Sequence, residues 1–244
     1  MILRFIDSHT QAWDTVVNFV HADGRRWYLA GGTALSLYLA HRDSEDLDLF
    51  IHENFDADEL ADLLDSSGYF AIDLVEENTV NCFLDETRVQ FLGVPAQTVL
   101  AEPHIINGLA VASMKDIMAM KMAAVTGRAK LRDYVDIMEI DVRGGVSVEL
   151  GLSYLVKRFH LRTPDTTVRQ IVSQLGYLDD LDDDPLAGYS KSAVVDFWSA
   201  RAQKAMMNLI TYGLPTLETA TPENQFTSVT KRKVTRTFGT DLGM

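Results

Sequence analysis

Two short polar stretches have the residue types and spacing of a metal–nucleotide site. The first, Gly31-Gly32-Thr33, follows the apolar run Trp27-Tyr28-Leu29-Ala30. Two successive glycines let the backbone turn sharply and bring its N–H groups close to phosphate oxygens at a helix start. In the second stretch, Ser44-Glu45-Asp46-Leu47-Asp48, the carboxylates of Asp46 and Asp48 are two residues apart. On a strand they point to one face, and such hard oxygen ligands suit Mg²⁺ bridging the phosphates of a nucleotide.

A second group of charged residues comes much later in the chain. Lys121 and Arg128 are seven apart, so on one continuous helix they project from nearly the same face and can grip a triphosphate. Further on, Arg132 and Asp136 can pair at i,i+4, and Asp133 can pair with an arginine or bind a metal. Taken alone, such a segment is more typical of the solvated face of an amphipathic helix.

The hydrophobic pattern predicts the elements that position these residues. In the first half, helices are expected over 8–22, 33–40 and 57–64, and strands over 27–30, 46–51, 69–75, 80–84 and 88–94. From residue 113 the apolar period becomes 3.6, which predicts helices over 113–127, 130–140, 147–160, 165–175 and 190–212. The sequence therefore predicts an α+β protein with a mixed-sheet domain (1–110), a helical domain (111–218) and a tail or irregular arm (219–244).

Composition narrows the class of protein. A chain of 244 residues with 47% hydrophobic residues can bury a sizeable core, and a net charge of −13 argues against a protein that coats nucleic acid. No apolar run approaches membrane-spanning length and the first residues do not read as a signal peptide, so we expect a cytoplasmic protein. Cys82 is the single cysteine and reads as a core residue. The acidic run 179–184 and the basic residues 231–236 read as a solvated loop and tail.

In the order of its motifs the chain resembles the AbiEii/AbiGii-type toxin nucleotidyltransferases, a branch of the DNA-polymerase-β-like nucleotidyltransferase superfamily that includes abortive-infection toxins. The resemblance spans roughly residues 28 to 140 and rests on Gly31 to Leu35, His41 to Phe50, Lys121, Arg128 and Arg132 to Asp136. It implies a polymerase-β-like nucleotidyltransferase domain packed against a helical domain, with the nucleotide in the cleft between them.

The same resemblance implies an activity and partners. The reaction would be metal-dependent transfer of a nucleoside monophosphate (NMP) from an NTP to an acceptor hydroxyl, with release of pyrophosphate. Mg²⁺, or Mn²⁺ in its place, would be the metal, and RNA, foremost tRNA, the acceptor. The protein would act as the toxin of a toxin–antitoxin or phage-defence system, together with a cognate antitoxin protein.

Carried over by position, the family's site residues fall on three parts of this sequence. Gly31, Gly32 and Thr33 would lie against the β- and γ-phosphates, Asp46 and Asp48 would bind the metal, Lys121 and Arg128 would hold phosphate, and Asp133 would match the essential helical aspartate. Two further residues join the nucleotide-binding set. Arg42 is close enough in sequence to the acidic pair to contact phosphate or a carboxylate, and Ser44 can hold the loop against the acidic strand. His41, at the expected helix end, reads as a cap.

One departure from the pattern of the superfamily leaves other functions open. Where polymerase-β-like enzymes commonly place a third carboxylate on a later strand, this chain offers Gln90, whose uncharged amide is a poor substitute. Asp73, Glu76, Asp85 or Asp133 could serve instead. The alternatives are a catalytically weak nucleotide-binding protein with a regulatory role, which Gln90 favours, and a small-molecule nucleotidyltransferase of the antibiotic-modifying type.

Overall fold

The computed structural model describes residues 7–127 and 130–217. Its helices are α1 (Asp7–Asp23), α2 (Gly31–Leu39), α3 (Ala57–Ser66), α4 (Met114–Gly127), α5 (Leu131–Arg143), α6 (Val148–Phe159), α7 (Pro164–Leu175) and α8 (Lys191–Tyr212), with a short 3₁₀ helix η1 (Pro185–Ala187). Its strands are β1 (Tyr28–Ala30), β2 (Leu47–Ile51), β3 (Ala71–Glu76), β4 (Thr79–Leu84), β5 (Thr87–Gly93), β6 (His104–Ile106) and β7 (Leu109–Val111). The fold is α+β, as predicted.

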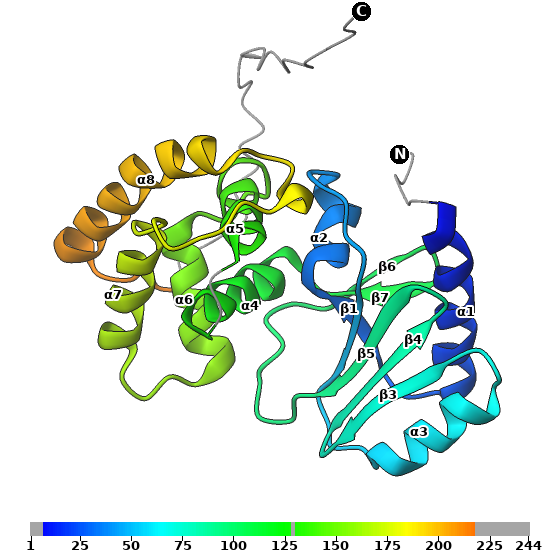
Figure 1. Cartoon of the computed structure of the whole chain (residues 1–244). Coiled ribbons are helices and arrows are strands. Elements are labelled where there is room, and N and C mark those ends of the chain that lie inside the picture. The colour runs from blue at the N-terminus through cyan, green and yellow to red at the C-terminus, as the bar shows by residue number, and fades with distance from the viewer. Residues whose placement is uncertain (1–6, 128–129, 218–244) are drawn as a thin grey trace, which may run out of the picture.

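The strands form one mixed sheet in the order β3-β4-β5-β2-β1-β7-β6. β2 lies in the middle, parallel to β5 and antiparallel to β1. Figure 1 shows α4 to α8 gathered on one side of the molecule, and α1 and α3 beside the sheet on the other. α2 runs from the end of β1 toward the helical half, so the segment between β1 and β2 lies where the two halves meet.

The alternation of buried residues explains why the central strand forms. In β2, Leu47, Leu49 and Ile51 are buried while Asp48 and Phe50 are partly exposed, which is the period of two expected of a strand. The strand begins at Leu47, one residue later than predicted, so Asp46 lies immediately before it.

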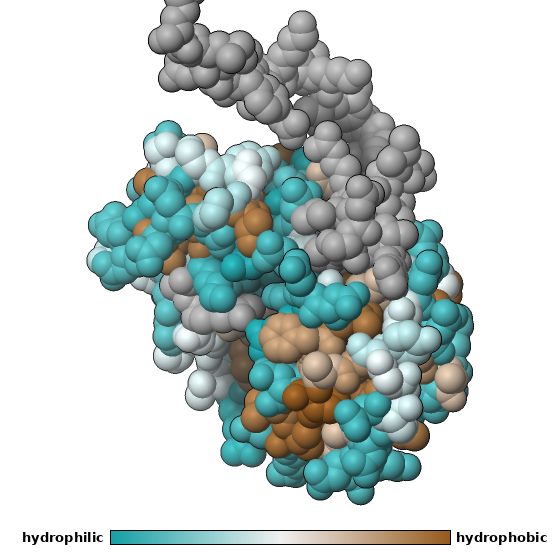
Figure 2. Space-filling model, turned by 45° about the vertical axis from the view of Figure 1, so that its right-hand side comes forward, coloured by the Kyte–Doolittle hydropathy of each residue, from teal (hydrophilic) through white to brown (hydrophobic). Residues whose placement is uncertain are grey.

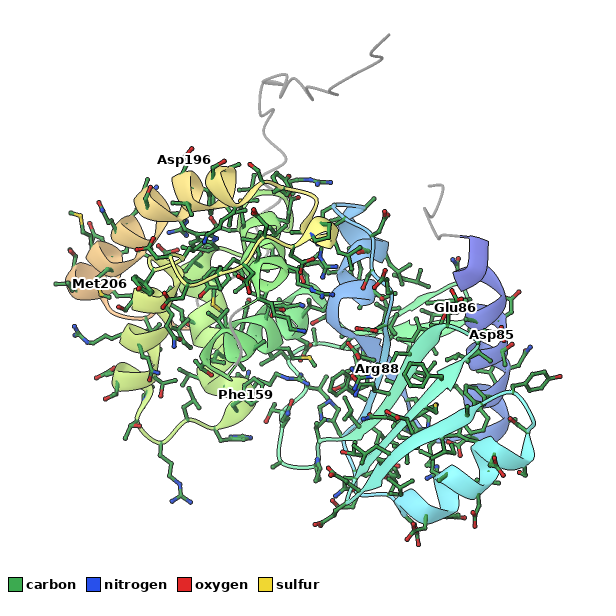
Figure 3. The ribbon with its side chains drawn as sticks, in the orientation of Figure 1. Asp85, Glu86, Arg88, Phe159, Asp196 and Met206 are labelled. Atoms are coloured by element: carbon green, nitrogen blue, oxygen red, sulfur yellow. The ribbon has the colours of Figure 1, made fainter. Side chains whose placement is uncertain are left out.

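Turns that require positive φ angles fix two hairpins. Asp85 (φ 51°) and Glu86 connect β4 to β5, and both are labelled in Figure 3. Asn107 (φ 47°) and Gly108 (φ 85°) connect β6 to β7, two strands that the sequence reading did not predict. Because β7 ends at Val111, the sheet extends one residue beyond the predicted boundary at 110.

A buried ion pair ties the sheet to the helices. The guanidinium of Arg158, a fully buried residue of α6, donates to Asp116 of α4, to Tyr28 Oη at 3.0 Å and to Gln97 Oε1 at 3.0 Å. The hydrophobic core is continuous across both halves and includes Cys82. Burial raises the pKa of the Cys82 thiol to about 12, which agrees with the predicted core role.

The surface differs between the two halves. Figure 2 shows apolar colour gathered over part of the sheet half and mainly hydrophilic colour over the helical half. The exposed large hydrophobic residues of the sheet half include Leu63 on α3, Leu74 on β3 and Phe83 on β4. Among the described residues, no helix is both long enough and apolar enough to span a membrane.

Candidate active site

A polar pocket at the junction of the two halves gathers residues from distant parts of the chain. Its lining comes from α2, the loop before β2, β2, β5, α4 and the start of α5: Gly32, Arg42, Ser44, Asp46, Asp48, Arg88, Gln90, Lys121, Lys130, Arg132 and Asp133. Most of the predicted site residues are among them. Gly31 and Thr33 are adjacent in sequence to the lining residue Gly32, and Arg128 lies outside the described residues.

Gly31 and Gly32 leave room for side chains of other segments that lie close to their Cα atoms. Gly31 has a φ of +71°, and a Cβ placed there would collide with the carboxylate of Asp48. A Cβ at Gly32 would lie 2.5 Å from Arg42 Nη2 and 3.0 Å from Ser44 Oγ. The glycine turn therefore lets the backbone lie directly against the side chains of the acidic strand and of the loop before it.

Gly31→Ala is accordingly expected to lower the free energy of unfolding more than Gly24→Ala does. Both glycines have a positive φ (+71° and +76°), so each alanine adds backbone strain of about 1–2 kcal/mol. Only Gly31 also has a close neighbour, since nothing lies within 4 Å of a Cβ at Gly24. Urea unfolding of both variants measures the difference, expected to be about 1–3 kcal/mol from overpacking. Equal losses would show that Asp48 moves aside without cost.

Thr33 and Ser44 hold the acidic segment in place. Thr33 is 4% exposed, and its Oγ1 lies 2.9 Å from Ser44 Oγ and within hydrogen-bonding distance of the Asp46 carbonyl. Through this hydrogen bond Ser44 can hold the loop before β2 in position, which is the role predicted for it. Thr33 is not part of the pocket lining, and its contact with a nucleotide stays a prediction.

Asp46 and Asp48 both line the pocket, as expected of carboxylates two residues apart. Asp48 is directly opposite Gln90 of β5 in the register of the parallel strands. In the amide orientation that satisfies both partners, Gln90 donates to Asp48 Oδ1 and accepts from Arg88 Nη2, each at 3.2 Å. Where a third carboxylate was expected, the chain therefore has the neutral amide of Gln90, which lies between the Asp48 carboxylate and the Arg88 guanidinium.

The donor set of the pocket fits one hard cation. Among the described residues, no three His, Cys, Asp or Glu side chains are close enough to hold a metal ion together. Asp46 and Asp48 supply two carboxylates at an open, polar pocket, and Mg²⁺ is commonly bound by one or two carboxylates with phosphate oxygens and water as its other ligands. Asp133 lines the pocket from the opposite side, on α5.

Behind the pocket is a buried cluster of charges centred on Asp136, whose side chain is fully buried. Lys121 Nζ lies 2.6 Å from Asp136 Oδ2 and 2.9 Å from Asp133 Oδ1. Arg42 donates to both oxygens of Asp136, from Nε at 2.7 Å and from Nη2 at 2.9 Å. His41 Nε2 lies 2.7 Å from Asp136 Oδ1. The cluster links the end of α2 to α4 and α5.

The charges of this cluster stabilise one another. Burial alone would raise the pKa of Asp136, but Lys121, His41 and Arg42 together hold it well below its usual range. Burial alone would lower the pKa of Lys121, but Asp136 and Asp133 raise it above its usual value. Asp136 is therefore ionised and Lys121 protonated at neutral pH.

The cluster corrects three sequence interpretations. The 130–140 segment is not a solvated face, because Asp133, Asp136 and Glu139 are buried. The predicted Arg132–Asp136 pair is wrong, since Arg132 Nε instead donates to Asp184 Oδ2 at 2.9 Å. His41 does not cap α2 with its ring, which contacts Asp136.

The sequence did not identify the pocket residues Arg88 and Lys130. The alternation of β5 places Arg88 on the same face as Gln90 and could have identified it.

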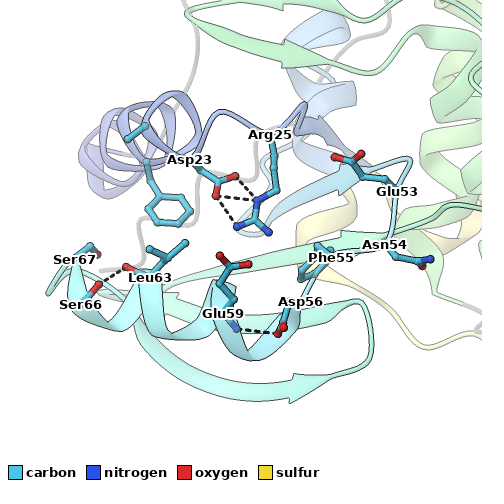
Figure 4. A pocket seen from close by; sticks show the side chains of 12 residues that line it. Asp23, Arg25, Glu53, Asn54, Phe55, Asp56, Glu59, Leu63, Ser66 and Ser67 are labelled. Carbon is cyan, nitrogen blue, oxygen red and sulfur yellow. Dashed lines mark hydrogen bonds and ion pairs between the residues drawn. The ribbon is translucent and has the colours of Figure 1, made fainter.

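A larger cavity, of about 800 Å³, lies between α1 and α3 and is separate from this chemistry (Figure 4). Some of its polar groups are bonded to one another: Asp23 pairs with Arg25 at 2.7 Å, and Asp56 caps α3 by accepting from the N–H of Glu59 at 3.1 Å. None of the predicted site residues that the structure describes lines it. The small polar pocket is therefore the candidate site.

The chain is similar in sequence to a known protein family and to a bacterial protein. The sequence model of the family described as "Nucleotidyl transferase AbiEii toxin, Type IV TA system" matches residues 18–99, a range that includes the glycine turn, Asp46, Asp48 and Gln90. An uncharacterized protein of Aquifex aeolicus (strain VF5) is 30% identical over 158 residues, which cover 63% of this chain and 74% of that protein.

A solved structure of low sequence identity shows the same fold. The crystal structure of an inferred nucleotidyltransferase from H. pylori is similar with a TM-score of 0.51 and 21% identity, covering 84% of this chain and 96% of that one. JHP933 from Helicobacter pylori has a TM-score of 0.49 and 19% identity, over 84% of this chain and 93% of that one. We conclude that this chain is a nucleotidyltransferase that belongs to the AbiEii toxin family of type IV toxin–antitoxin systems.

Proposed function

We propose that the protein transfers an NMP from an NTP to a hydroxyl of RNA, with tRNA as the leading acceptor, and that it requires Mg²⁺ or Mn²⁺. The observation that carries this proposal is the pocket in which Asp46 and Asp48 lie with cationic residues from β5, α4 and α5. Phosphoryl transfer needs little covalent chemistry from a protein. Positioning of the reactants and stabilisation of charge on the phosphate oxygens provide most of the catalysis.

The proposed transfer makes one bond and breaks another. The acceptor oxygen bonds to the α-phosphorus, the bond from that phosphorus to the bridging oxygen breaks, and pyrophosphate leaves with the electron pair. Asp46 and Asp48 would hold Mg²⁺, which when bound offsets the negative charge of the phosphates. The proton of the acceptor hydroxyl passes to a pocket carboxylate, because the Gln90 amide is not a base.

We further propose that this transfer makes the protein toxic and that a cognate antitoxin protein opposes it. The family description, a type IV toxin–antitoxin system, supports this role. NTPs and RNA are both cytoplasmic, so we propose the cytoplasm as its place of action.

The test is to incubate the protein with each α-labelled NTP, Mg²⁺ and total RNA. We expect label on an RNA band, loss of labelling when EDTA removes the metal, and recovery when Mg²⁺ or Mn²⁺ is restored in excess. Label found only on a protein would overturn the RNA acceptor, and label on a small molecule would favour the antibiotic-type reaction. Full transfer in EDTA would overturn the metal requirement.

A second function, regulatory nucleotide binding with little or no transfer, is favoured by Gln90. A neutral amide lies directly opposite Asp48, where a third carboxylate would strengthen the binding of a second metal ion. Binding of labelled NTP without transfer to any acceptor in the same assay would support this function over the first.

A further inference from the structure

Lys121, predicted to bind phosphate, and Arg42, predicted to contact phosphate or a carboxylate, are both bound to carboxylates. Lys121 is 6% exposed and contacts Asp133 and Asp136, and the side chain of Arg42 is only 2% exposed and contacts both oxygens of Asp136. Each positive charge is thus matched by a buried negative charge within hydrogen-bonding distance. A triphosphate entering the pocket meets a nearly neutral cluster on this side.

Two other pocket cations are not held in this way. Arg88 lies on β5, two residues before Gln90 and on the same face, and Lys130 immediately precedes α5 and is exposed. Neither takes part in an ion pair within residues 7–127 and 130–217, whereas Arg132 is paired with Asp184. Figure 3 shows Arg88 on the side of the sheet nearest the helical half.

The positions of these two side chains suit a phosphate chain that extends from the acidic pair. Arg88 lines the pocket from the sheet and Lys130 from the helical half, with Asp46 and Asp48 in the same lining. The main-chain N–H groups at the start of α5 add the positive end of a helix of 13 residues beside Lys130. A guanidinium and an ammonium with no carboxylate partner in the part of the chain that the structure describes can bind phosphate oxygens.

We propose that Arg88 and Lys130 are the cations that hold the triphosphate of the nucleotide in this pocket, while Lys121 and Arg42 keep α2, α4 and α5 together through Asp133 and Asp136. This assignment rests on the proposed function, because it concerns the substrate of the same site. It assigns phosphate binding from the charge balance of the structure, in place of Lys121, which was named by family resemblance, and of Arg42, which was named by its position in the sequence.

The test is isothermal titration of the whole protein with magnesium tripolyphosphate. Arg88→Gln and Lys130→Gln are each expected to weaken binding about tenfold or more, because each loses a charge-assisted hydrogen bond. Arg26→Gln and Lys204→Gln remove exposed cations outside the pocket and should bind like wild type. Thermal unfolding of all four variants checks that each one is folded.

The outcomes separate this inference from the proposed function. If the two pocket variants bind tripolyphosphate as tightly as the two controls while the wild type labels RNA, the inference is overturned and the function stands. If the pocket variants lose tripolyphosphate binding and the wild type labels no acceptor, the inference stands and the transfer reaction is wrong.

Discussion

Asp48→Asn should reduce the rate of NMP transfer by at least about 1,000-fold while leaving the protein folded. Asn has nearly the same shape as Asp, so the close fit of the side chain against Gly31 is kept. The substitution removes one of the two charged ligands proposed for the metal, and the neighbouring Gln90 amide cannot replace it. The rate is measured as label transferred from the preferred α-labelled NTP to RNA, under single-turnover conditions.

An exposed aspartate provides the matched control for this variant. Asp62 lies on α3, away from the pocket, and Asp62→Asn makes the same chemical change at the surface. It should transfer NMP at the wild-type rate. Labelling by Asp48→Asn at a rate within a few-fold of Asp62→Asn would remove Asp48 from the catalytic site.

Gln90 allows a related comparison of metal binding. If the amide is what limits the pocket to one metal ion, Gln90→Asp should add a second binding event for Mn²⁺ in the presence of a non-hydrolysable NTP. The register places the new carboxylate directly opposite Asp48. Mn²⁺ binding followed by electron paramagnetic resonance counts the ions without reference to activity, and an unchanged count would show that the amide is not the limiting feature.

The site residues on and beside the sheet could be predicted from the sequence, because the patterns that indicate them involve residues close together in the chain. The spacing of Asp46 and Asp48 fixes their common face once the segment is a strand, and two glycines after an apolar run indicate a tight backbone turn. The strands β6 and β7 each have three residues, too few for a periodic signal, whereas the equally short β1 was predicted from its apolar run before the glycine turn. Asn107-Gly108 between them is, however, a common hairpin turn.

The helical part could be read only incompletely, because its partners are distant in sequence. On an isolated helix Arg132 can reach Asp136 at i,i+4, and nothing nearby in the sequence shows that both have other partners. The folded chain brings Asp184 to Arg132, and Arg42 with Lys121 to Asp136. Which charge pairs with which is decided by the packing of α2 against α4 and α5, and a periodic pattern contains no information about that packing.

Asp136 is the residue whose loss should harm stability most. Asp136→Asn leaves Lys121 and Arg42 buried without their shared carboxylate, and breaking a buried ion pair in this way costs about 3–5 kcal/mol of unfolding free energy. Chemical denaturation at pH 7 measures the loss, and Asp62→Asn, at an exposed site, should differ from wild type by less than about 0.5 kcal/mol. Adding Arg42→Met to Asp136→Asn should recover part of the loss, because it removes the cation that bound Asp136, whereas Lys121 keeps its contact with Asp133.

The pH dependence of the unfolding free energy is a second way to test the predicted role of Asp136. The pKa of Asp136 is lower in the folded protein than in the unfolded chain, where it is about 3.9. The unfolded state therefore binds the proton more readily, so the stabilisation from ionised Asp136 is complete above about pH 4 and is lost as the pH falls toward the folded pKa. Asp136→Asn lacks this contribution at every pH, so the stability gap between wild type and variant should be widest near neutrality and should narrow below about pH 4. A gap that stays constant down to the acid transition would mean that the cost of the variant comes from packing rather than from the charge of Asp136.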